Sequence, residues 1–318
     1  MIPAYNSAKT IGETLRSVLS QAPSADAMQI TVIDNASTDD THAIVDRIAL
    51  PANASRVEVI RNSENIGLVG NWNACIEHAR GELVLILHSD DYLAPGYFAA
   101  VETAFAQRPD ADLCLVRSLI VDANSEPERL ARRLGRTGDE LSIWTLAYGN
   151  EFYAPGVVVR RSCYERLGGF TGALSSVPGM SYVLDWEMWL RILASGKAVY
   201  VNEPLACYRE TGGNATSRLS RTGDDLRELI RFGAVLARRI GGFEMQSWRE
   251  YLKNHAAWAV KNWAKAGDAD AQRLNYDFWR QFATAGEKLD EFLTKAKAAG
   301  VAGERRLRRA LKPSKKSR

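Results

Sequence analysis

Cysteine is scarce in this chain, long hydrophobic runs are absent, and neither sign of charge is in large excess. The four cysteines are far apart and form no Cys-x-x-Cys pair, which argues against a zinc site and fits reduced thiols: Cys75, Cys114, Cys163 and Cys207. No apolar stretch reaches the roughly 18 residues of a membrane-spanning helix, and we recognise no secretory signal peptide. We therefore expect a cytoplasmic protein that is soluble or attached peripherally to the inner face of the membrane.

Charge and glycine patterns disfavour two further classes of function. The 41 basic and 38 acidic side chains leave a net charge of +3, too small for a molecule-wide attraction to nucleic acid. Gly67 and Gly70 lack the Gly-x-Gly-x-x-Gly spacing of a dinucleotide site, so hydride transfer is not expected. With 318 residues, of which 46% are hydrophobic and 25% charged, the chain can form one large or two modest globular domains.

Helical and strand patterns alternate in the first third of the chain. Apolar spacing predicts helices over residues 10–21, 44–48 and 69–79. Runs of β-branched and apolar residues predict strands over 30–33, 57–60 and 83–87. This order indicates βαβ units and a mostly parallel sheet, and Ser37 or Thr38 could cap the second helix. Because only Met1 and Ile2 precede Pro3, either the first strand is very short or the chain starts further upstream.

Beyond residue 109 the alternation becomes less regular. We expect strands over 112–116, 157–159 and 198–201, a mobile surface loop over 124–139, and a helix that begins near Leu184. After Gly212 and Gly213 the pattern is helical. Three apolar faces mark these helices: Leu226, Leu229 and Ile230; Trp248, Leu252 and His255; Phe278, Trp279 and Phe282. A domain or subdomain boundary is therefore predicted near residue 215.

Two adjacent carboxylates, Asp90 and Asp91, follow the most apolar predicted strand. Ligands bind beyond the carboxyl ends of strands in open α/β sheets, and Mg²⁺ or Mn²⁺ takes one or two carboxylates together with phosphate oxygens. An Asp pair can equally cap a turn. Polar residues at 3–6 and 34–37 follow two other predicted strands, so the three strand ends could line one crevice. A divalent metal and a phosphate ester are the first ligands to consider.

The order and spacing of these blocks resemble those of family 2 glycosyltransferases. The blocks are Pro3-Ala4-Tyr5-Asn6, Val32-Ile33-Asp34-Asn35-Ala36-Ser37-Thr38-Asp39, Asn65-Ile66-Gly67 with Asn71-Trp72-Asn73, Gly81-Glu82, and Leu87-His88-Ser89-Asp90-Asp91. The resemblance covers residues 1–215 and implies the α/β GT-A fold, a Rossmann-like mixed sheet flanked by helices, here with a C-terminal helical extension. Residues 1–110 would be the nucleotide-sugar-binding half, 111–215 the acceptor-binding half and 216–318 a helical region.

The resemblance also implies where the donor, a nucleotide-diphospho-sugar, would bind. Pro3 and Tyr5 would hold the nucleotide base by backbone contact and stacking. Asp34 would hydrogen-bond the base edge, which suits uracil, and Asn65 would also bind the donor. Asp90 would meet the ribose or the sugar-phosphate.

Asp91 would bind the divalent cofactor, Mg²⁺ or Mn²⁺, which stabilises charge on the leaving diphosphate. The chain departs from the family pattern at His88, where an acidic residue is common. It also departs at Asn35, where Asp or another small polar residue is common. These departures would change the composition of the metal's ligand set.

A general base is required if the sugar is transferred with inversion, because the acceptor hydroxyl must lose a proton as it attacks. A run that begins at Leu184 resembles the family's acidic motif, in which Glu-Asp is the usual opening. The base role then belongs to Asp185, with Glu187 in reserve. The alternative is that Asp185 only caps the helix while Trp186 and Trp189 pack its face.

Arg209 lies in a segment similar to the family's closing loop, in which Arg or His near the diphosphate helps to neutralise the leaving group. Thr211 stands where a His is frequent. Arg209 could have this electrostatic role, or it could equally pair with a surface carboxylate.

The chain ends in a basic tail, in which Glu304 is the single acid among nine basic residues: Lys297, Arg305, Arg306, Arg308, Arg309, Lys312, Lys315, Lys316 and Arg318. Such a run is usually a solvated terminus, but it could also contact an anionic lipid surface. A nucleic-acid role is not expected, since no base-reading motif accompanies the charges.

These patterns predict an inverting, metal-dependent glycosyltransferase. It would move a sugar from a nucleotide-sugar, in the first place a UDP-sugar, to a saccharide or lipid-linked saccharide in surface polysaccharide synthesis. One alternative is a sugar-nucleotide or glycan-binding protein without activity. A nucleotidyltransferase is the weaker alternative, because the chain has no Gly-rich, Lys-bearing phosphate loop near its start.

Overall fold

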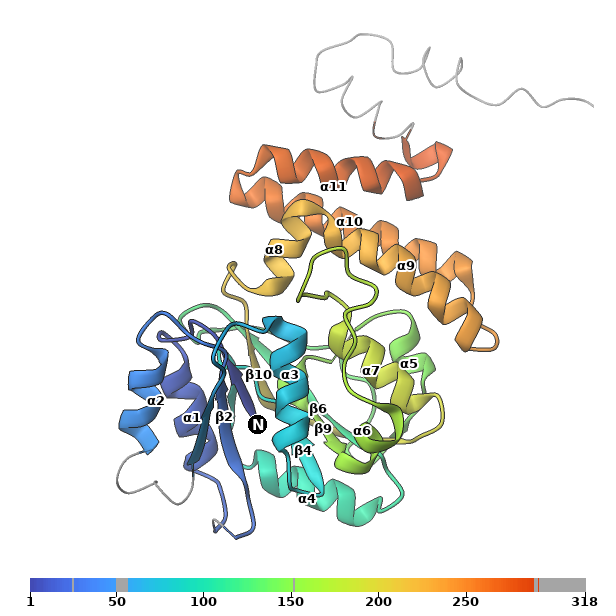
Figure 1. Ribbon diagram of the computed structural model, residues 1–318. Coiled ribbons are helices and arrows are strands. Elements are labelled where there is room, and N and C mark those ends of the chain that lie inside the picture. Colours follow the sequence, from blue (N-terminus) through green and yellow to red (C-terminus); the bar gives the residue numbers. More distant parts are fainter. Residues whose placement is uncertain (25, 50–56, 151, 289–290, 292–318) are drawn as a thin grey trace, which may run out of the picture.

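Helices cover a β-sheet on both faces in the first two thirds of the chain, and the later part that the structure describes contains helices and no strand (Figure 1). The computed structural model describes residues 1–24, 26–49, 57–150, 152–288 and 291. Within these residues, no helix is long and apolar enough to cross a membrane. The basic tail lies outside the described residues, so its predicted membrane contact stays a prediction.

The strands form two hydrogen-bonded groups. In the first, β1 (Ile2–Ala4), β2 (Ile30–Asp34) and β3 (Val57–Arg61) are parallel and lie in the order β1-β2-β3. The second has the order β4-β9-β6-β10-β5, formed by β4 (Leu83–Leu85), β9 (Val157–Arg160), β6 (Leu113–Val121), β10 (Ala198–Arg209) and β5 (Tyr92–Leu93). Two short strands pair at its margins, β7 (Pro127–Leu130) with β6 and β8 (Glu140–Leu141) with β10.

Backbone hydrogen bonds around Met1 join the two groups. The Met1 nitrogen donates to the Leu85 oxygen at 2.9 Å, and the Leu87 nitrogen donates to the Met1 oxygen at 3.0 Å. Hydrogen bonds in which one residue bonds to the two residues on either side of its neighbour are typical of parallel strands, so β1 runs parallel to the segment that follows β4. The carboxyl ends of β1, β2 and this segment therefore lie at one edge of the sheet. The strand ends that were predicted to line one crevice therefore do meet at one edge of the sheet.

The expectation of a mostly parallel sheet is corrected to a mixed sheet. In the second group only β6 and β10 are parallel, whereas β4–β9, β6–β9 and β10–β5 are antiparallel. Antiparallel strands need no crossover helix, so the regular alternation that predicts βαβ units is lost after residue 109. The segment predicted as a mobile loop likewise contains β7, whose four residues are all exposed.

Helices cover the sheet on both sides. Along β6, Cys114 and Val116 belong to a hydrophobic core with α1 (Ile11–Leu19), α2 (Thr41–Ala49) and α4 (Tyr97–Gln107). Leu113 and Leu115 point the other way, because strand side chains alternate. They belong to a second core with α3 (Gly67–His78), α5 (Trp144–Ala147), α6 (Arg161–Leu167) and α7 (Leu184–Leu193).

The C-terminal helices are α8 (Ala215–Thr222), α9 (Asp224–Arg239), α10 (Met245–Ala266) and α11 (Ala269–Phe282). The second core continues into α9 and α10, and partly buried side chains of α11 pack against it. Phe232 of α9 and Trp248 of α10 are buried in it, and α10 and α11 lie side by side (Figure 1). The expected face at Leu226 and Leu229 is confirmed, whereas Ile230 is 38% exposed. A helix repeats every 3.6 residues, so adjacent positions such as Leu229 and Ile230 diverge in direction.

Two helix starts differ from the expected caps. Helix α2 begins at Thr41 rather than directly after Ser37 or Thr38, and the Asp39 Oδ1 accepts from the Thr41 nitrogen at 3.0 Å. The N-cap of α7 is Val183, so Asp185 lies inside its first turn and is not its capping residue. The predicted start of this helix near Leu184 is confirmed.

Candidate active site

A cleft of about 1130 Å³ lies at the edge where β1 and β2 end, beside the start of α3, the segment before α7 and the start of α8. The structure brings several predicted site residues to this one cleft: Pro3, Tyr5, Asn65, His88, Asp90 and Asp185. Asp34, Asp91 and Arg209 are not among the residues that line it. Residues from 3 to 218 contribute, so the cleft exists only in the folded chain.

Asparagine side chains shape the donor side of this cleft. Asn35 donates to the Asn65 Oδ1 at 2.8 Å, and its own Oδ1 accepts from Asn62 at 2.9 Å and from the Ile66 nitrogen at 3.0 Å. Asn62 also donates to Asn71, which donates to the Ile33 oxygen. The amide at Asn35 can both donate and accept, which a carboxylate could not do, so this departure from the family pattern has a structural explanation.

Asp34 supports the turn after β2. It is only 4% exposed, and its Oδ1 accepts from the Ser37 nitrogen at 3.0 Å. Ser37 in turn accepts from the Asn6 nitrogen at 3.0 Å. Asp34 therefore ties the two polar loops after β1 and β2 together, and its predicted contact with the nucleotide base stays a prediction.

The acidic group after β4 is compact. Its three members, His88, Asp90 and Asp91, offer ligand atoms that all lie within 4.8 Å of one another. His88 Nδ1 is 3.2 Å from Asp91 Oδ2, and its ring packs against Trp72. Threonine side chains on α1 hold the loop from behind, since Thr14 donates to the Asp91 oxygen at 2.6 Å.

Burial governs the protonation of this group. It raises the pKa of Asp91 to about 6, and the neighbouring His88 opposes this only in part. Burial also acts to lower the pKa of His88, but the contact with Asp91 and the charges of Asp90 and Asp185 outweigh it and raise that pKa. The three carboxylates and the imidazole thus influence one another electrostatically.

The donor set fits a divalent cation. Among the described residues, the buried His88 Nε2 has no hydrogen-bond partner, and the buried Asp91 Oδ2 has only His88 Nδ1 beside it at 3.2 Å, an arrangement that is costly unless another group satisfies these atoms. Carboxylates suit both Mg²⁺ and Mn²⁺, and an added imidazole is better tolerated by Mn²⁺ than by Mg²⁺. His88, Asp90 and Asp91 are therefore the residues of the described chain that could hold the metal.

Arg209 does not reach the cleft. Its side chain is 2% exposed, pairs with Glu13 of α1 at 2.5 Å and donates to Ser125 and to the Asp90 oxygen. Its backbone nitrogen donates to Asp91 Oδ1 at 2.8 Å. Of the two roles left open by the sequence, the structure supports the ion pair with a carboxylate, and Arg209 braces the acidic loop from behind.

Two cations that sequence reasoning missed, Lys9 and Arg218, line the cleft instead. Arg218 is on α8, whose N-cap Asn214 accepts from the Ser217 nitrogen. The N-cap signal of Asn214 could have predicted that Arg218 follows within the first turns of a helix. Nothing in the sequence around Lys9 indicates that it faces the cleft.

Asp185 is half-buried at the wall of the cleft. Its Oδ1 accepts from the Trp186 nitrogen at 2.7 Å. Burial raises its pKa above the usual value of 3.8, although that hydrogen bond and the charge of His88 oppose the change. The reserve candidate Glu187 is buried and neutralised by Arg191 at 2.9 Å and Arg239 at 3.3 Å, and it does not line the cleft.

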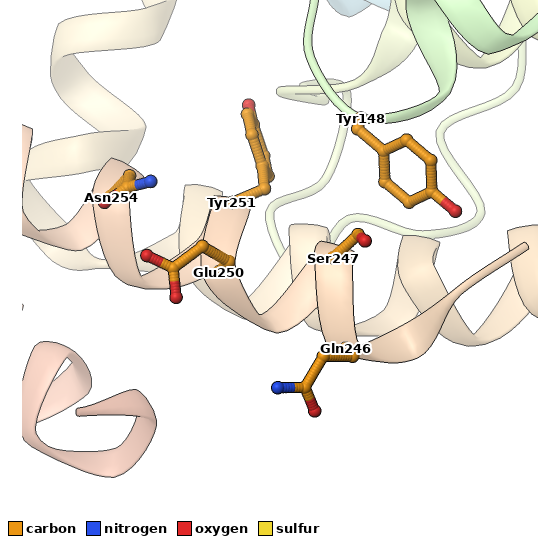
Figure 2. A pocket seen from close by; sticks show the side chains of 6 residues that line it. All are labelled: Tyr148, Gln246, Ser247, Glu250, Tyr251 and Asn254. Atoms are coloured by element: carbon orange, nitrogen blue, oxygen red, sulfur yellow. The ribbon is translucent and has the colours of Figure 1, made fainter. Parts of the chain in front are cut away.

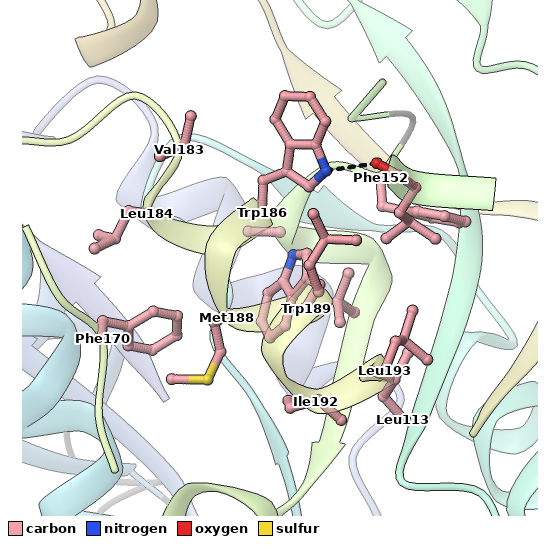
Figure 3. Packing of buried hydrophobic residues seen from close by; sticks show 14 of the residues in the cluster. Leu113, Phe152, Phe170, Val183, Leu184, Trp186, Met188, Trp189, Ile192 and Leu193 are labelled. Carbon is pink, nitrogen blue, oxygen red and sulfur yellow. Dashed lines mark hydrogen bonds between the residues drawn. The ribbon is translucent and has the colours of Figure 1, made fainter. Parts of the chain in front are cut away.

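Aromatic packing fixes the helix that carries Asp185. Trp186 and Trp189 are each 1% exposed, and Trp186 Nε1 donates to the Leu146 oxygen at 2.7 Å (Figure 3). Trp186 also contacts Phe232 and Trp248, with ring centroids 5.3 and 5.6 Å apart. The first turn of α7 is therefore held by both the sheet domain and the C-terminal helices.

A second hollow, of about 490 Å³, lies along α10 and beside Tyr148 (Figure 2). It contains one carboxylate, Glu250, and no cluster of residues suited to catalysis. The cleft with the acidic group is therefore the candidate active site.

The chain resembles known proteins in sequence and in fold. A sequence model of glycosyl transferase family 2 matches residues 1–167, more than half of the chain. An uncharacterized protein of Mycobacterium tuberculosis is 28% identical over 237 residues, which are 70% of this chain and 69% of that protein. The abequosyltransferase RfbV of Salmonella typhimurium is 32% identical over 154 residues, which are 48% of this chain and 45% of RfbV.

A shorter match covers the Escherichia coli protein WfaP, a UDP-Glc:α-D-GlcNAc-diphosphoundecaprenol β-1,3-glucosyltransferase. It is 37% identical over 92 residues, which are 29% of this chain and 34% of WfaP.

Two solved structures share the fold. One is Staphylococcus aureus TarS 1–349 in complex with UDP-GlcNAc, with a TM-score of 0.58, 17% identity, and coverage of 89% of this chain and 91% of that one. The other is the mannosyltransferase PcManGT from Pyrobaculum calidifontis in complex with GDP-Man and Mn²⁺, with a TM-score of 0.55, 18% identity, and coverage of 96% and 86%.

Proposed function

The chain belongs to glycosyltransferase family 2 and has the GT-A fold, and from this premise we propose that it transfers a sugar with inversion from a nucleotide-diphospho-sugar to a saccharide acceptor. One observation carries the proposal. A single cleft collects Pro3, Tyr5 and Asn65 at the ends of early elements together with Asp90 and Asp185. Such a cleft would provide donor contacts, an acidic group and a base within one site.

The donor would lie on the side of β1 and α3. Tyr5 is 44% exposed, so its ring is available to stack on a nucleotide base, and Asn65 is held in place by Asn35. UDP is the nucleotide we propose, since WfaP uses a UDP-sugar and TarS binds one. Asp34 would contribute by holding the loop beside the base.

His88, Asp90 and Asp91 would hold Mg²⁺ or Mn²⁺. When bound there, the cation would offset the negative charge that develops on the leaving diphosphate. Lys9 and Arg218 would add positive charge at the cleft, in the role that the sequence assigned to Arg209. Arg209 would act by holding the backbone of the acidic pair.

Asp185 would accept the proton of the acceptor hydroxyl. Its raised pKa makes the ionised carboxylate a stronger base than a solvated aspartate. Attack by the deprotonating hydroxyl on the face opposite the diphosphate would invert the anomeric centre.

The acceptor we propose is a saccharide or a lipid-linked saccharide of a surface polysaccharide. WfaP supports this class, because it acts on a diphosphoundecaprenol-linked sugar. An enzyme with such an acceptor would work at the inner face of the membrane, to which the basic tail could attach it.

The decisive experiment is a donor screen with Mn²⁺ or Mg²⁺, with saccharide and diphosphoundecaprenol-linked acceptors. We expect Asp91→Ala to lose metal-dependent donor binding by calorimetry, and Asp185→Asn to keep binding but lose at least about 100-fold in transfer rate.

The control is Asp46→Asn, which removes an exposed carboxylate that pairs with Arg61. Equal activity in all variants would refute both roles. Donor binding without transfer in the wild type would favour a sugar-nucleotide-binding protein.

A further inference from the structure

We propose that Glu228, on the C-terminal helix α9, is a positioning residue for the acceptor side of the active-site cleft. Glu228 does not line the cleft itself. It is 0% exposed, and its carboxylate faces the segment that leads into α7. The proposal rests on the proposed function, because it concerns how the base Asp185 is held.

Three consecutive residues of this segment donate to the Glu228 carboxylate. The Ser181 hydroxyl and the Val183 nitrogen, at 3.3 Å, donate to Oε1, and the Tyr182 nitrogen donates to Oε2 at 3.0 Å. A buried carboxylate is costly unless hydrogen bonds compensate it. Here the hydrogen bonds come from a non-helical segment, residues 181–183. The Glu228 carboxylate therefore stabilises the one backbone conformation in which all three donors point toward it.

The shape of this segment decides where catalytic groups lie. Ser181 and Tyr182 line the cleft directly. Val183 is the N-cap of α7, and Asp185 follows two residues later in the first turn. By accepting from the Val183 nitrogen, Glu228 sets the starting point of the helix that carries the base.

The segment is also held from the opposite side. The Leu68 nitrogen, at the start of α3, donates to the Gly179 oxygen at 2.7 Å. Residues 179–183 therefore lie between α3 on the donor side and α9 in the helical region. If the Glu228 contacts are removed, the α3 contact stays, so the acceptor side should lose its geometry while the donor side keeps it.

A second α9 carboxylate provides a matched control. Asp225 is also 0% exposed, but its Oδ2 faces His255 Nε2 at 2.9 Å and not the 181–183 backbone. Asp225→Asn therefore removes a buried charge from the same helix without removing an acceptor from that backbone. Any general loss of stability in α9 should appear in both variants.

The experiment compares Glu228→Gln, Glu228→Ala and Asp225→Asn with the wild type. Glutamine keeps one acceptor oxygen but places an NH₂ group against one of the two backbone nitrogens, Tyr182 or Val183, that need an acceptor. We expect kcat to fall about 10-fold in Glu228→Gln and about 100-fold in Glu228→Ala, because small misplacements of a catalytic group cost this much. Calorimetric Kd values for UDP with Mn²⁺ should change less than about 2-fold, and Asp225→Asn should keep its kcat.

Amide hydrogen exchange adds a readout that needs no turnover. We expect faster exchange at Tyr182 and Val183 in both Glu228 variants, and unchanged exchange there in Asp225→Asn. Unchanged exchange in Glu228→Ala would overturn the proposal, as would an unchanged kcat or equal losses of kcat in Asp225→Asn. If the wild type transfers no sugar, the proposed function fails, and the exchange data still decide whether Glu228 holds the segment.

Discussion

At the residue scale, the protonation of Asp185 links its burial to activity. Burial raises the pKa of Asp185 above 3.8, so the carboxylate accepts a proton at a higher pH than a solvated aspartate does. A general base must be ionised, and transfer should therefore decline as the pH falls through this raised pKa. We predict an acid limb in the pH profile of kcat that lies at a higher pH than the limb of a solvated aspartate would.

The measurement is kcat at saturating donor, metal and acceptor from about pH 4 to 9, with thermal unfolding followed in parallel to exclude acid denaturation. In Asp185→Asn the remaining activity should lack this limb. A limb in the wild type at the pKa of a solvated aspartate would show that Asp185 is not the titrating base.

Gly67, at the start of α3 on the donor side of the cleft, lies close to the backbone of Gly179. Gly67 has φ +78°, and a Cβ there would lie 2.9 Å from the Gly179 Cα. Gly67→Ala would strain the backbone and push residue 179 away from α3, so we expect a loss of about 1–3 kcal/mol in the free energy of unfolding. Urea unfolding measures this.

Gly241→Ala is the control for this change, because a Cβ at residue 241 meets nothing within 4 Å. It should alter the stability by less than about 0.5 kcal/mol. If both variants lose the same amount of stability, the close approach of residues 67 and 179 is not the cause.

At the scale of the element, α7 depends on partners before and after it in the chain. Trp186 Nε1 donates a hydrogen bond to the Leu146 oxygen (Figure 3). Its ring also packs against Phe232 and Trp248. Trp186→Phe removes the hydrogen bond and leaves space among the rings, so we expect a loss of about 1–3 kcal/mol. Trp258→Phe, at a position that is 43% exposed, should cost much less. Equal midpoints in urea for the two variants would contradict this packing role.

At the scale of the whole molecule, the second hydrophobic core crosses both boundaries proposed at residues 110 and 215. It contains Trp72, Leu113 and Trp186 together with Phe232 and Trp248. A fragment of residues 1–214 would expose the faces of α7 that α9 and α10 cover. We predict that this fragment aggregates or lacks a cooperative thermal transition, whereas residues 1–288 unfold like the full chain.

Near-UV circular dichroism, gel filtration and calorimetry of the two fragments test this prediction. A monomeric 1–214 fragment with the melting temperature of the full chain would show that the helical region is an independent domain. In that case the role of Glu228 would also need revision, since α9 would not be needed for the native segment before α7.

Local patterns were sufficient for much of the fold. The spacing of Ile11, Leu15 and Val18 predicted α1, and the runs at residues 30–33 and 57–60 predicted β2 and β3. The polar residues after the predicted strands, Pro3 to Asn6 and Asp90, also predicted residues that share the cleft, whereas Asn65 was expected there only from the resemblance to family 2 glycosyltransferases. Helices, strands and the meeting of strand ends follow from residues that are neighbours in sequence and from the rule that parallel strands end at one edge. The order of the residues was therefore enough to predict them.

Only the tertiary structure decided which charged side chains face the cleft and which pair with segments far away in sequence. Arg209 turns to Glu13 of α1, 196 residues away in sequence, while Lys9 and Arg218 reach the cleft. Glu228 meets residues 181–183 only because α9 packs on α7. No local periodicity encodes such contacts, since they arise when the core closes and each buried charge must find its partner. The sequence by itself therefore determined the sheet edge and its acidic pair, and the folded core determined which charges surround them.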